Sequence, residues 1–276
     1  MRIPAVLFYG NCQAHLLCAC LRSLPGVEKL YQVERFLDFI YPGSEGMAAP
    51  PEELLERCEV LIIQMAAKRE DPEYVERLAS RGTKIIRFPT TSCPPLWPQE
   101  CPDKRNHTEN KYPFGRYPHG DRVLLGLMDQ GKSEEEIVEE YFAMDVASLF
   151  NVDRVMEYWR FTLSALDARS DIKAAAFLEN NFRTKRFFYT RNHPSTELTC
   201  FLLQEIIRRA WGDGTPCSHV RFAASVPMDQ YMTPIHPSVA RALALKWCGD
   251  ETLHRHYDNG WFTHREFARR YVRYEG

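Results

Sequence analysis

The sequence lacks an apolar run long enough to cross a membrane, and it lacks an excess of basic residues. Its longest apolar stretch, near residues 60–67, is interrupted by Gln64 and is far shorter than the roughly 20 residues that a spanning helix needs. The formal net charge is -2 over 276 residues, whereas a general nucleic-acid-binding protein usually carries a basic excess. The sequence therefore predicts neither a membrane span nor a nucleic-acid partner.

A continuous signal core and a disulfide framework are also missing. Met1-Arg2 and the apolar residues that follow resemble the start of a short secretion signal, but polar residues 10–13 and His15 interrupt the stretch in its middle. The nine cysteines are odd in number and irregular in spacing, which is not typical of a disulfide framework. We therefore expect a reducing, cytoplasmic location.

Several familiar motifs are absent as well. The chain contains no Walker-type phosphate loop, no Gly-x-Gly-x-x-Gly and no His-Glu-x-x-His. One loop carries Cys93, Cys101, His107 and His119, but zinc sites usually pair ligands two to four residues apart. The sequence thus predicts no metal site and no nucleotide hydrolase.

What is present is an alternation of strands and helices. We expect strands at residues 4–9, 28–33, 59–63 and 84–88, separated by helices at 12–23, 50–58 and one opened by Asp71-Pro72. That order predicts an α/β protein with a parallel sheet and flanking helices. At this length a single domain over 1–276 is expected, with an α/β core at 1–90 and 183–212.

The remaining segments have other patterns. Residues 91–120, rich in proline and aromatic residues, predict an irregular loop or lid. Residues 121–182 predict a helical insertion, in which Ser133 and Glu136 form a capping box. A strand at 186–190 should precede a helix that runs to about residue 211. Within the C-terminal part, 213–276, we expect short helices around Pro237, Leu253 and Glu266.

The turn Gly10-Asn11-Cys12-Gln13, between the first strand and its helix, carries the main chemical signal. The N–H groups of a helix's first turn lack internal partners and its dipole is positive there, so the pKa of Cys12 should fall. The same N–H groups and the Asn11 side chain can stabilise an oxyanion, and Gly10 permits the tight turn. These four residues are therefore candidates for nucleophile, oxyanion and substrate contacts.

A thiol nucleophile needs a base, and three histidines are candidates. His193 follows the strand expected at 186–190 and precedes a helix, which would place it at the carboxyl edge of the sheet, where such folds bind ligands. His15 shares a helix face with Cys12. His236 repeats the His-Pro-Ser pattern of residues 193–195. Gln64, at the end of a buried strand, should point to the same edge and contact substrate or the oxyanion.

Basic and aromatic residues near this edge predict a site for a phosphorylated cofactor. Aromatic rings can stack on an adenine while guanidinium groups pair with phosphates. The candidates lie in the irregular loop and beside the predicted strand at 186–190: Arg116, Tyr117, His119, Asp121, Arg122, Arg183 and Arg191.

Taken together, four features resemble the WcbI family of polysaccharide-biosynthesis proteins. They are the Gly-Asn-Cys-Gln turn at 10–13, the strand ending in Gln64, the Tyr-x-x-Gly-Asp segment at 117–121, and Asn192-His193-Pro194-Ser195. The resemblance covers residues 3–245. It implies a coenzyme A-binding acetyltransferase that acts on a capsular or surface polysaccharide, with Asn192 among the site residues. The cysteine turn also resembles the Gly-Asp-Ser turn of SGNH hydrolases, although position 190 is Thr where their Asp-x-x-His motif has Asp.

The resulting hypothesis is O-acetyl transfer from acetyl-CoA to a sugar hydroxyl. Cys12 carries the acetyl group as a thioester, or His193 activates the sugar hydroxyl for direct transfer. Two alternatives stay open at this point: an esterase or thioesterase that uses the same site with water, and a non-catalytic ligand-binding protein.

Overall fold

The structure, a computed structural model, describes residues 3–37, 49–66, 71–212 and 227–276. The chain divides into two compact units, each assembled from separated stretches. The first unit comprises residues 1–91, 160–179 and 194–227; the second comprises 92–159, 180–193 and 228–276. The insertion expected at 121–182 is shared between them, and the single domain over 1–276 stays a prediction.

A four-stranded parallel sheet forms the centre of the first unit, in the order β2-β1-β3-β4. The strands are β1 (Ala5–Gly10), β2 (Gln32–Leu37), β3 (Cys58–Met65) and β4 (Lys84–Pro89). The two central strands, β1 and β3, are almost continuously buried, which explains their unbroken apolar runs. The α/β class with a parallel sheet is confirmed.

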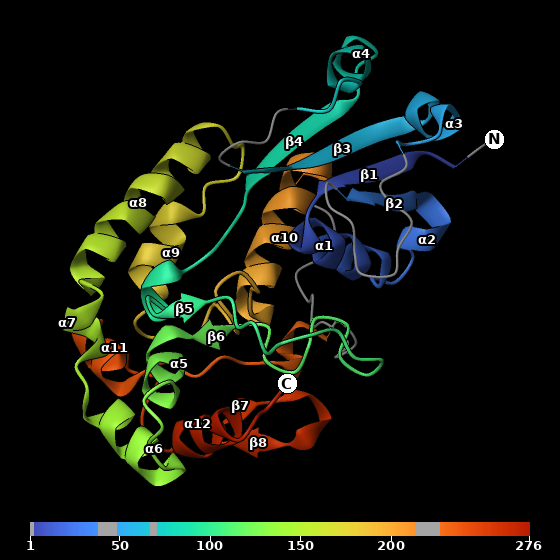
Figure 1. Ribbon diagram of the computed structural model, residues 1–276. Helices are drawn as coiled ribbons and strands as arrows, with labels where there is room; N and C mark the ends of the chain where they lie inside the picture. The colour runs from blue at the N-terminus through green and yellow to red at the C-terminus, as the bar shows by residue number, and fades with distance from the viewer. Residues whose placement is uncertain (1–2, 38–48, 67–70, 213–226) are drawn as a thin grey trace. The chain divides into compact units, whose positions relative to one another are not determined.

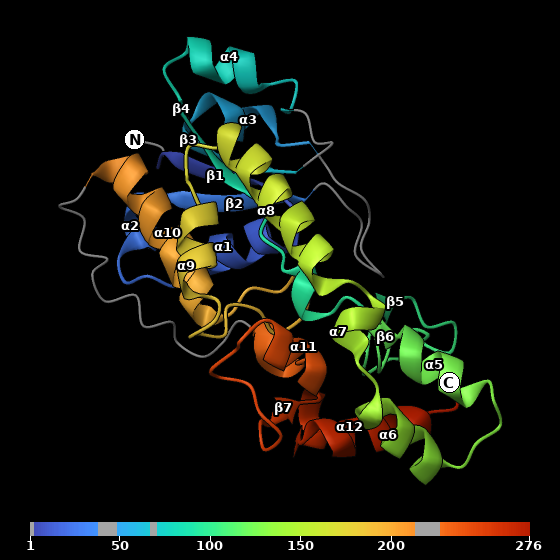
Figure 2. The ribbon, with the colours of Figure 1, turned by 90° about the vertical axis from the view of Figure 1, so that its left-hand side faces the viewer.

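Helices cover both faces of this sheet (Figures 1 and 2). On one face lie α3 (Glu52–Glu56) and α4 (Val75–Ser80), whose leucines and valine pack with Leu7, Leu61 and Ile63 in one buried cluster. On the other face lie α1 (Cys12–Arg22) and α10 (Thr196–Trp211). A single turn, α2 (Val27–Leu30), links α1 to β2. The parallel strands therefore all end at one edge of the sheet, where the turn after β1 lies.

Two local predictions in this unit are wrong. The strand expected at 28–33 begins only at Gln32, because residues 27–30 form a helical turn. Asp71 does not cap a helix: α4 starts at Val75 after Tyr74, and the Asp71 carboxylate pairs with Arg87 on β4. In the case of Asp71, a tertiary partner competes with the local capping signal.

The second unit is mainly helical. Its α-helices and 3-10 helices are η1 (Pro94–Leu96), α5 (Arg122–Met128), α6 (Glu134–Ala143), α7 (Val146–Leu149), η2 (Pro227–Gln230), α11 (Pro237–Ala242), η3 (Tyr257–Asn259) and α12 (His264–Val272). Two further helices, α8 (Val152–Ala168) and α9 (Ala175–Asn181), have residues in both units. The predicted capping box of Ser133 and Glu136 is confirmed at the start of α6. Among the described residues, no helix combines the length and apolar character that crossing a membrane requires.

Two short antiparallel hairpins complete the second unit. The first pairs β5 (Glu100–Cys101) with β6 (Gly120–Asp121), and the second pairs β7 (His254–Arg255) with β8 (Trp261–Phe262). The second hairpin occupies the region where a helix around Leu253 was expected, so that prediction is wrong, whereas the helices at Pro237 and Glu266 are confirmed. Residues 213–226 of the predicted C-terminal part lie outside the described residues.

Candidate active site

The predicted strand-turn-helix around Cys12 is confirmed. Gly10 is the last residue of β1, Asn11 caps the helix, and Cys12 is the first residue of α1. A side chain at position 10 would not fit, because its Cβ would lie 2.6 Å from Gln64 Cβ and 2.9 Å from Ala14 Cβ. Glycine is therefore needed here for close packing between the ends of β1 and β3.

A buried chain of hydrogen bonds holds this turn in place. The Asn11 N–H donates to Gln64 Oε1 at 2.9 Å, and Gln64 Nε2 donates to Gln13 Oε1 at 3.2 Å. Gln13 Nε2 in turn donates to the Thr91 carbonyl at 2.6 Å, and the Thr91 N–H donates back to Gln13 Oε1 at 3.1 Å. Gln13 and Gln64 therefore position the turn, and the substrate or oxyanion contact expected of them stays a prediction. No sequence pattern pointed to Thr91.

Asn11 is oriented by its own helix. Its Oδ1 accepts the Gln13 N–H at 2.9 Å and lies 3.8 Å from the Cys12 sulfur, within reach of the thiol hydrogen. Within the part of the chain that the structure describes, Asn11 Nδ2 has no hydrogen-bond partner. An amide whose oxygen is fixed and whose N–H₂ group is available is suited to donate to a developing oxyanion.

The prediction that the pKa of Cys12 falls is wrong in its net direction. The N–H groups of Cys12 and Gln13 do favour the thiolate, as expected at a helix start, but burial of the thiol raises its pKa by more. The resting form is therefore the thiol. A nucleophilic Cys12 requires a base to accept its proton.

His15 is half-buried on α1, one turn after Cys12. Burial, and next the positive charge of Arg35, lower the pKa of His15 below its ordinary value. The imidazole is accordingly neutral at pH 7, which is the form that a general base needs.

The reasoning that placed His193 beside the sheet is wrong. In the described part of the chain, residues 186–190 form no strand, and the sheet contains only β1 to β4. His193 belongs to the second unit and Cys12 to the first, so the pairing of these two residues stays a prediction. Burial, and next the nearby His119, lower the pKa of His193 to about 4, which keeps its ring neutral.

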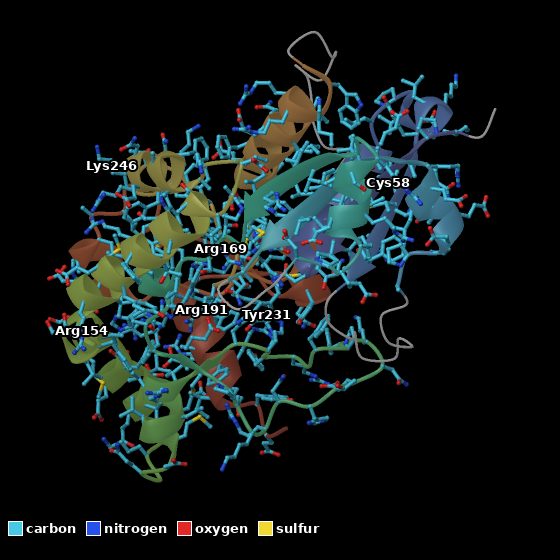
Figure 3. The ribbon with its side chains drawn as sticks, turned by 90° about the horizontal axis from the view of Figure 1, so that it is seen from above. Cys58, Arg154, Arg169, Arg191, Tyr231 and Lys246 are labelled. Atoms are coloured by element: carbon cyan, nitrogen blue, oxygen red, sulfur yellow. The ribbon has the colours of Figure 1, made fainter. Side chains whose placement is uncertain are left out.

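A carboxylate–histidine pair lies next to His193 in the second unit. Glu100 Oε1 is 3.2 Å from His119 Nδ1, and the rings of His119 and His193 are 6.1 Å apart, edge to face. The Tyr231 ring, labelled in Figure 3, lies 5.9 Å from His119. A carboxylate on one ring nitrogen fixes the tautomer and leaves the other nitrogen for proton transfer. The sequence missed Glu100, because only the pairing of β5 with β6 brings residue 100 near residue 119.

Unpartnered polar atoms gather around this pair. Among the described residues, buried Glu100 Oε2, Tyr231 OH and Thr233 Oγ1 have no hydrogen-bond partner, and Glu100, His119 and Thr233 line the same small pocket. Buried polar atoms are rarely left so, and groups of them occur at binding or catalytic sites. The second unit thus holds a polar centre around His119, and the cofactor contact predicted for His119 stays a prediction.

The other predicted cofactor residues are mostly used by the protein. Tyr117 is buried among aromatic rings, including His256 and Tyr271, and the Asp121 carboxylate caps α5 and accepts the Tyr141 hydroxyl at 2.7 Å. The structure therefore shows a structural role for both residues, and the cofactor contact predicted for them stays a prediction. Among the predicted arginines, Arg116 pairs with Glu109, Arg183 stacks on Phe182 and Arg122 is exposed. Arg191, labelled in Figure 3, and the uncharged Asn192 lie in the bend before His193. His236 caps α11 and its Nε2 lies 3.0 Å from the Tyr141 carbonyl, which argues against a role as base.

Replacing Gly10 with alanine is expected to destabilise the protein by about 1–3 kcal/mol, because the new Cβ overlaps Gln64. Chemical denaturation with circular dichroism would measure the change. Gly126→Ala is the matched control, since nothing lies within 4 Å of a Cβ at that helical position; it should leave stability unchanged or raise it by up to about 1 kcal/mol. Equal stability of the Gly10→Ala protein and wild type would contradict the close packing described for this turn.

Comparisons with known proteins agree with this architecture. A family model described as "Polysaccharide biosynthesis enzyme WcbI" matches residues 5–211. A solved structure described as "Structural insights into WcbI, a novel polysaccharide biosynthesis enzyme" is similar, with a TM-score of 0.66 and 16% sequence identity over 99% of this chain and 90% of that one. The description of that structure also refers to a native protein without a disulfide bond between coenzyme A and one of its cysteines. No curated protein matches the chain.

Proposed function

Since this chain belongs to the WcbI family of polysaccharide biosynthesis enzymes, we propose that it transfers an acetyl group from acetyl-CoA to a hydroxyl of a capsular or surface polysaccharide or its precursor. The observation that carries the proposal is the turn at residues 10–13. There the half-buried thiol of Cys12 stands at the start of α1, next to Asn11. The side-chain nitrogen of Asn11 has no hydrogen-bond partner among the described residues. We further propose that the reaction takes place in the cytoplasm, in keeping with free cysteines throughout the described residues.

Coenzyme A as the acyl donor is supported by the similar structure, whose description mentions coenzyme A and one cysteine of that protein, without a disulfide bond between them. The residues of this chain fit a thioester donor. A thioester carbonyl that approached Cys12 would meet the N–H group of Cys12 and the Asn11 amide, and these can stabilise negative charge on its oxygen.

In the proposed reaction the Cys12 sulfur attacks the acetyl carbonyl while a histidine takes the thiol proton. The new S–C bond replaces the bond to the coenzyme A sulfur, and the histidine returns the proton to that leaving thiolate. A sugar hydroxyl then attacks the acetyl group on Cys12 and gives its proton to the same base. In the direct route, the base deprotonates the sugar hydroxyl and Cys12 carries no acetyl group.

Three histidines are candidates for the base. His15 shares α1 with Cys12, His193 is the residue predicted from sequence, and His119 has the carboxylate partner that often orients a catalytic imidazole. A pKa of about 4 makes His193 a weak base near pH 7, because an efficient general base has a pKa near the working pH. Glutamine replacements of the three histidines should therefore separate them by rate: the true base loses at least about 10²-fold.

The second candidate function is hydrolysis of an ester or thioester with water as the acceptor. The same turn would serve, since the resting thiol, the oxyanion donors and a neutral histidine are all that hydrolysis needs. Acetate release from a simple ester without any effect of coenzyme A would favour this function over transfer.

Thermal unfolding with and without coenzyme A or acetyl-CoA tests the donor. A ligand at a hundred times its dissociation constant adds about 2.7 kcal/mol, which should raise the midpoint by several degrees for a protein of this size. Desulfo-coenzyme A separates binding from covalent capture, because it keeps the nucleotide and lacks the thiol. No shift at millimolar coenzyme A would overturn the donor assignment and leave hydrolysis as the better account.

A further inference from the structure

A basic cluster in the second unit consists of Arg183, Arg186 and Lys246. These residues lie on two short segments that two hydrogen bonds join. The Lys246 N–H donates to the Arg183 carbonyl at 2.7 Å, and the Trp247 indole N–H donates to the Phe182 carbonyl at 2.7 Å. Among the described residues, no carboxylate forms an ion pair with any member of the cluster.

Arg186 is a half-buried member of this cluster. Its guanidinium lies over the Trp247 ring, 5.0 Å from the ring centroid, and within the described ranges its one hydrogen bond goes to the sulfur of Met232 at 3.3 Å. A guanidinium carries five N–H donors. None of the Arg186 nitrogens is a fully buried atom without a partner, so those that lack a partner are open to solvent and a ligand can reach them.

The charge of Arg186 is not balanced from its own surroundings. Burial lowers its pKa, and the groups whose charge would offset this effect belong to Cys248 and Tyr189, not to a carboxylate. A partly buried charge without an opposite charge is costly. An anionic group that pairs with Arg186 would therefore be bound favourably.

Helix α12 of the same unit shows the opposite arrangement. Three of its arginines pair with three glutamates of α6: Arg265 with Glu139, Arg269 with Glu135 and Arg273 with Glu134. Those charges are matched within the protein and need no outside partner. The basic cluster has no such match in the part of the chain that the structure describes, and this contrast indicates an anionic ligand.

The side chains of the cluster indicate which anion fits. The planar guanidinium of an arginine can bind a carboxylate or a phosphate through two parallel hydrogen bonds, and a lysine adds a compact positive charge. The partly exposed Trp247 ring beside Arg186 adds apolar surface, which suits a ring-shaped ligand better than a small ion. An acidic sugar unit combines an anionic group with such a ring.

We propose that the basic cluster binds an acidic saccharide, whose carboxylate or phosphate pairs with Arg186 under the attraction of Arg183 and Lys246, and whose ring packs on Trp247. The choice of a saccharide rests on the proposed function, to which the cluster adds that the saccharide is acidic. Binding at the cluster needs no acetyl group and no step at Cys12.

Isothermal titration calorimetry on the full chain, without acetyl-CoA, tests this site. The probes are trigalacturonate, glucose 6-phosphate and the uncharged maltotriose. We expect trigalacturonate or glucose 6-phosphate to bind, which distinguishes a carboxylate from a phosphate ligand. Maltotriose should bind at least about tenfold more weakly, because it cannot form charge-assisted hydrogen bonds.

Three variants locate the binding. Arg186→Gln should weaken binding of the acidic saccharide by at least about tenfold, since hydrogen bonds to charged groups are among the strongest. Lys246→Gln changes an exposed side chain, labelled in Figure 3, so the test stays decisive if Arg186→Gln does not fold. It should weaken binding about threefold. Arg154→Gln is the matched control, because it removes an exposed positive charge of the same unit outside the cluster, and it should bind like wild type.

Four results would overturn the proposal. They are equal binding of maltotriose and the acidic probes, equal loss of binding in Arg154→Gln and Lys246→Gln, tighter binding of polyglutamate than of either acidic saccharide, and displacement of the saccharide by coenzyme A. The last result would assign the cluster to the acyl donor, as predicted for Arg183.

The binding assay also separates this site from the proposed reaction. A wild-type protein that binds the acidic saccharide but transfers no acetyl group would count against the proposed function alone. A protein that transfers acetyl groups but binds neither acidic probe would count against the basic cluster alone.

Discussion

Replacing Cys12 with alanine is expected to lower the rate of acetyl transfer by at least about 10³-fold. The variant removes the proposed nucleophile, and loss of a covalent catalytic residue commonly costs this much or more. The oxyanion donors at the helix start remain, so a small residual rate is expected. The rate of transfer to a sugar acceptor, measured by the free coenzyme A thiol that is released, would show the effect.

Cys200→Ala is the control for this experiment. Cys200 is partly exposed on α10 of the same unit, so the replacement removes a thiol of similar exposure that lies outside the turn. It should keep the wild-type rate.

Mass spectrometry of the protein after incubation with acetyl-CoA and no acceptor would identify the route. An acetyl group on the Cys12 peptide supports the acyl-enzyme, and its absence with full activity supports direct transfer. An active Cys12→Ala enzyme would contradict the acyl-enzyme route and leave direct transfer as the working mechanism.

Acidification from pH 7 to pH 5 is expected to destabilise the second unit strongly. Burial lowers the pKa of His193 to about 4, of His254 to about 3 and of His256 to about 4, whereas an unfolded histidine titrates near 6.5. Between these values the unfolded chain binds more protons than the folded chain, so stability falls as the pH decreases through this window. By this linkage, each histidine lowers the free energy of unfolding by about 2 kcal/mol at pH 5. The three together lower it by about 6 kcal/mol, which is comparable with the whole stability of a typical domain.

Denaturant titrations at pH 7, 6 and 5 would measure this dependence. His254→Phe supplies the internal comparison, because a ring that cannot be protonated removes one of the three contributions and should reduce the loss between pH 7 and pH 5 by about 2 kcal/mol. His107→Phe, at an exposed position, should leave the loss unchanged. A stability that is constant from pH 7 to pH 5 would show that these histidines accept protons in the folded state as readily as in the unfolded one.

The sequence by itself determined the features that depend on neighbouring residues. Alternating strands and helices identified the parallel sheet, because continuous apolar strands are typical of a sheet covered on both faces. The turn at Gly10, with Asn11 as cap and Cys12 as the first helical residue, was recognisable for the same reason, as was the capping box of Ser133 and Glu136. Strand ends, helix caps and tight turns are encoded within a few residues, so they can be identified without the fold.

The tertiary structure decided everything that depends on distant residues. Gln13 and Gln64 hold the turn through hydrogen bonds to each other, to Thr91 and to the Asn11 N–H, which join residues far apart in the sequence. The pKa of Cys12 followed burial more than the helix start, and Glu100 reached His119 only through a hairpin. Burial and long-range hydrogen bonds arise from packing between segments that are remote in sequence, and these set the protonation and the partners of a reactive group, which a local pattern does not specify.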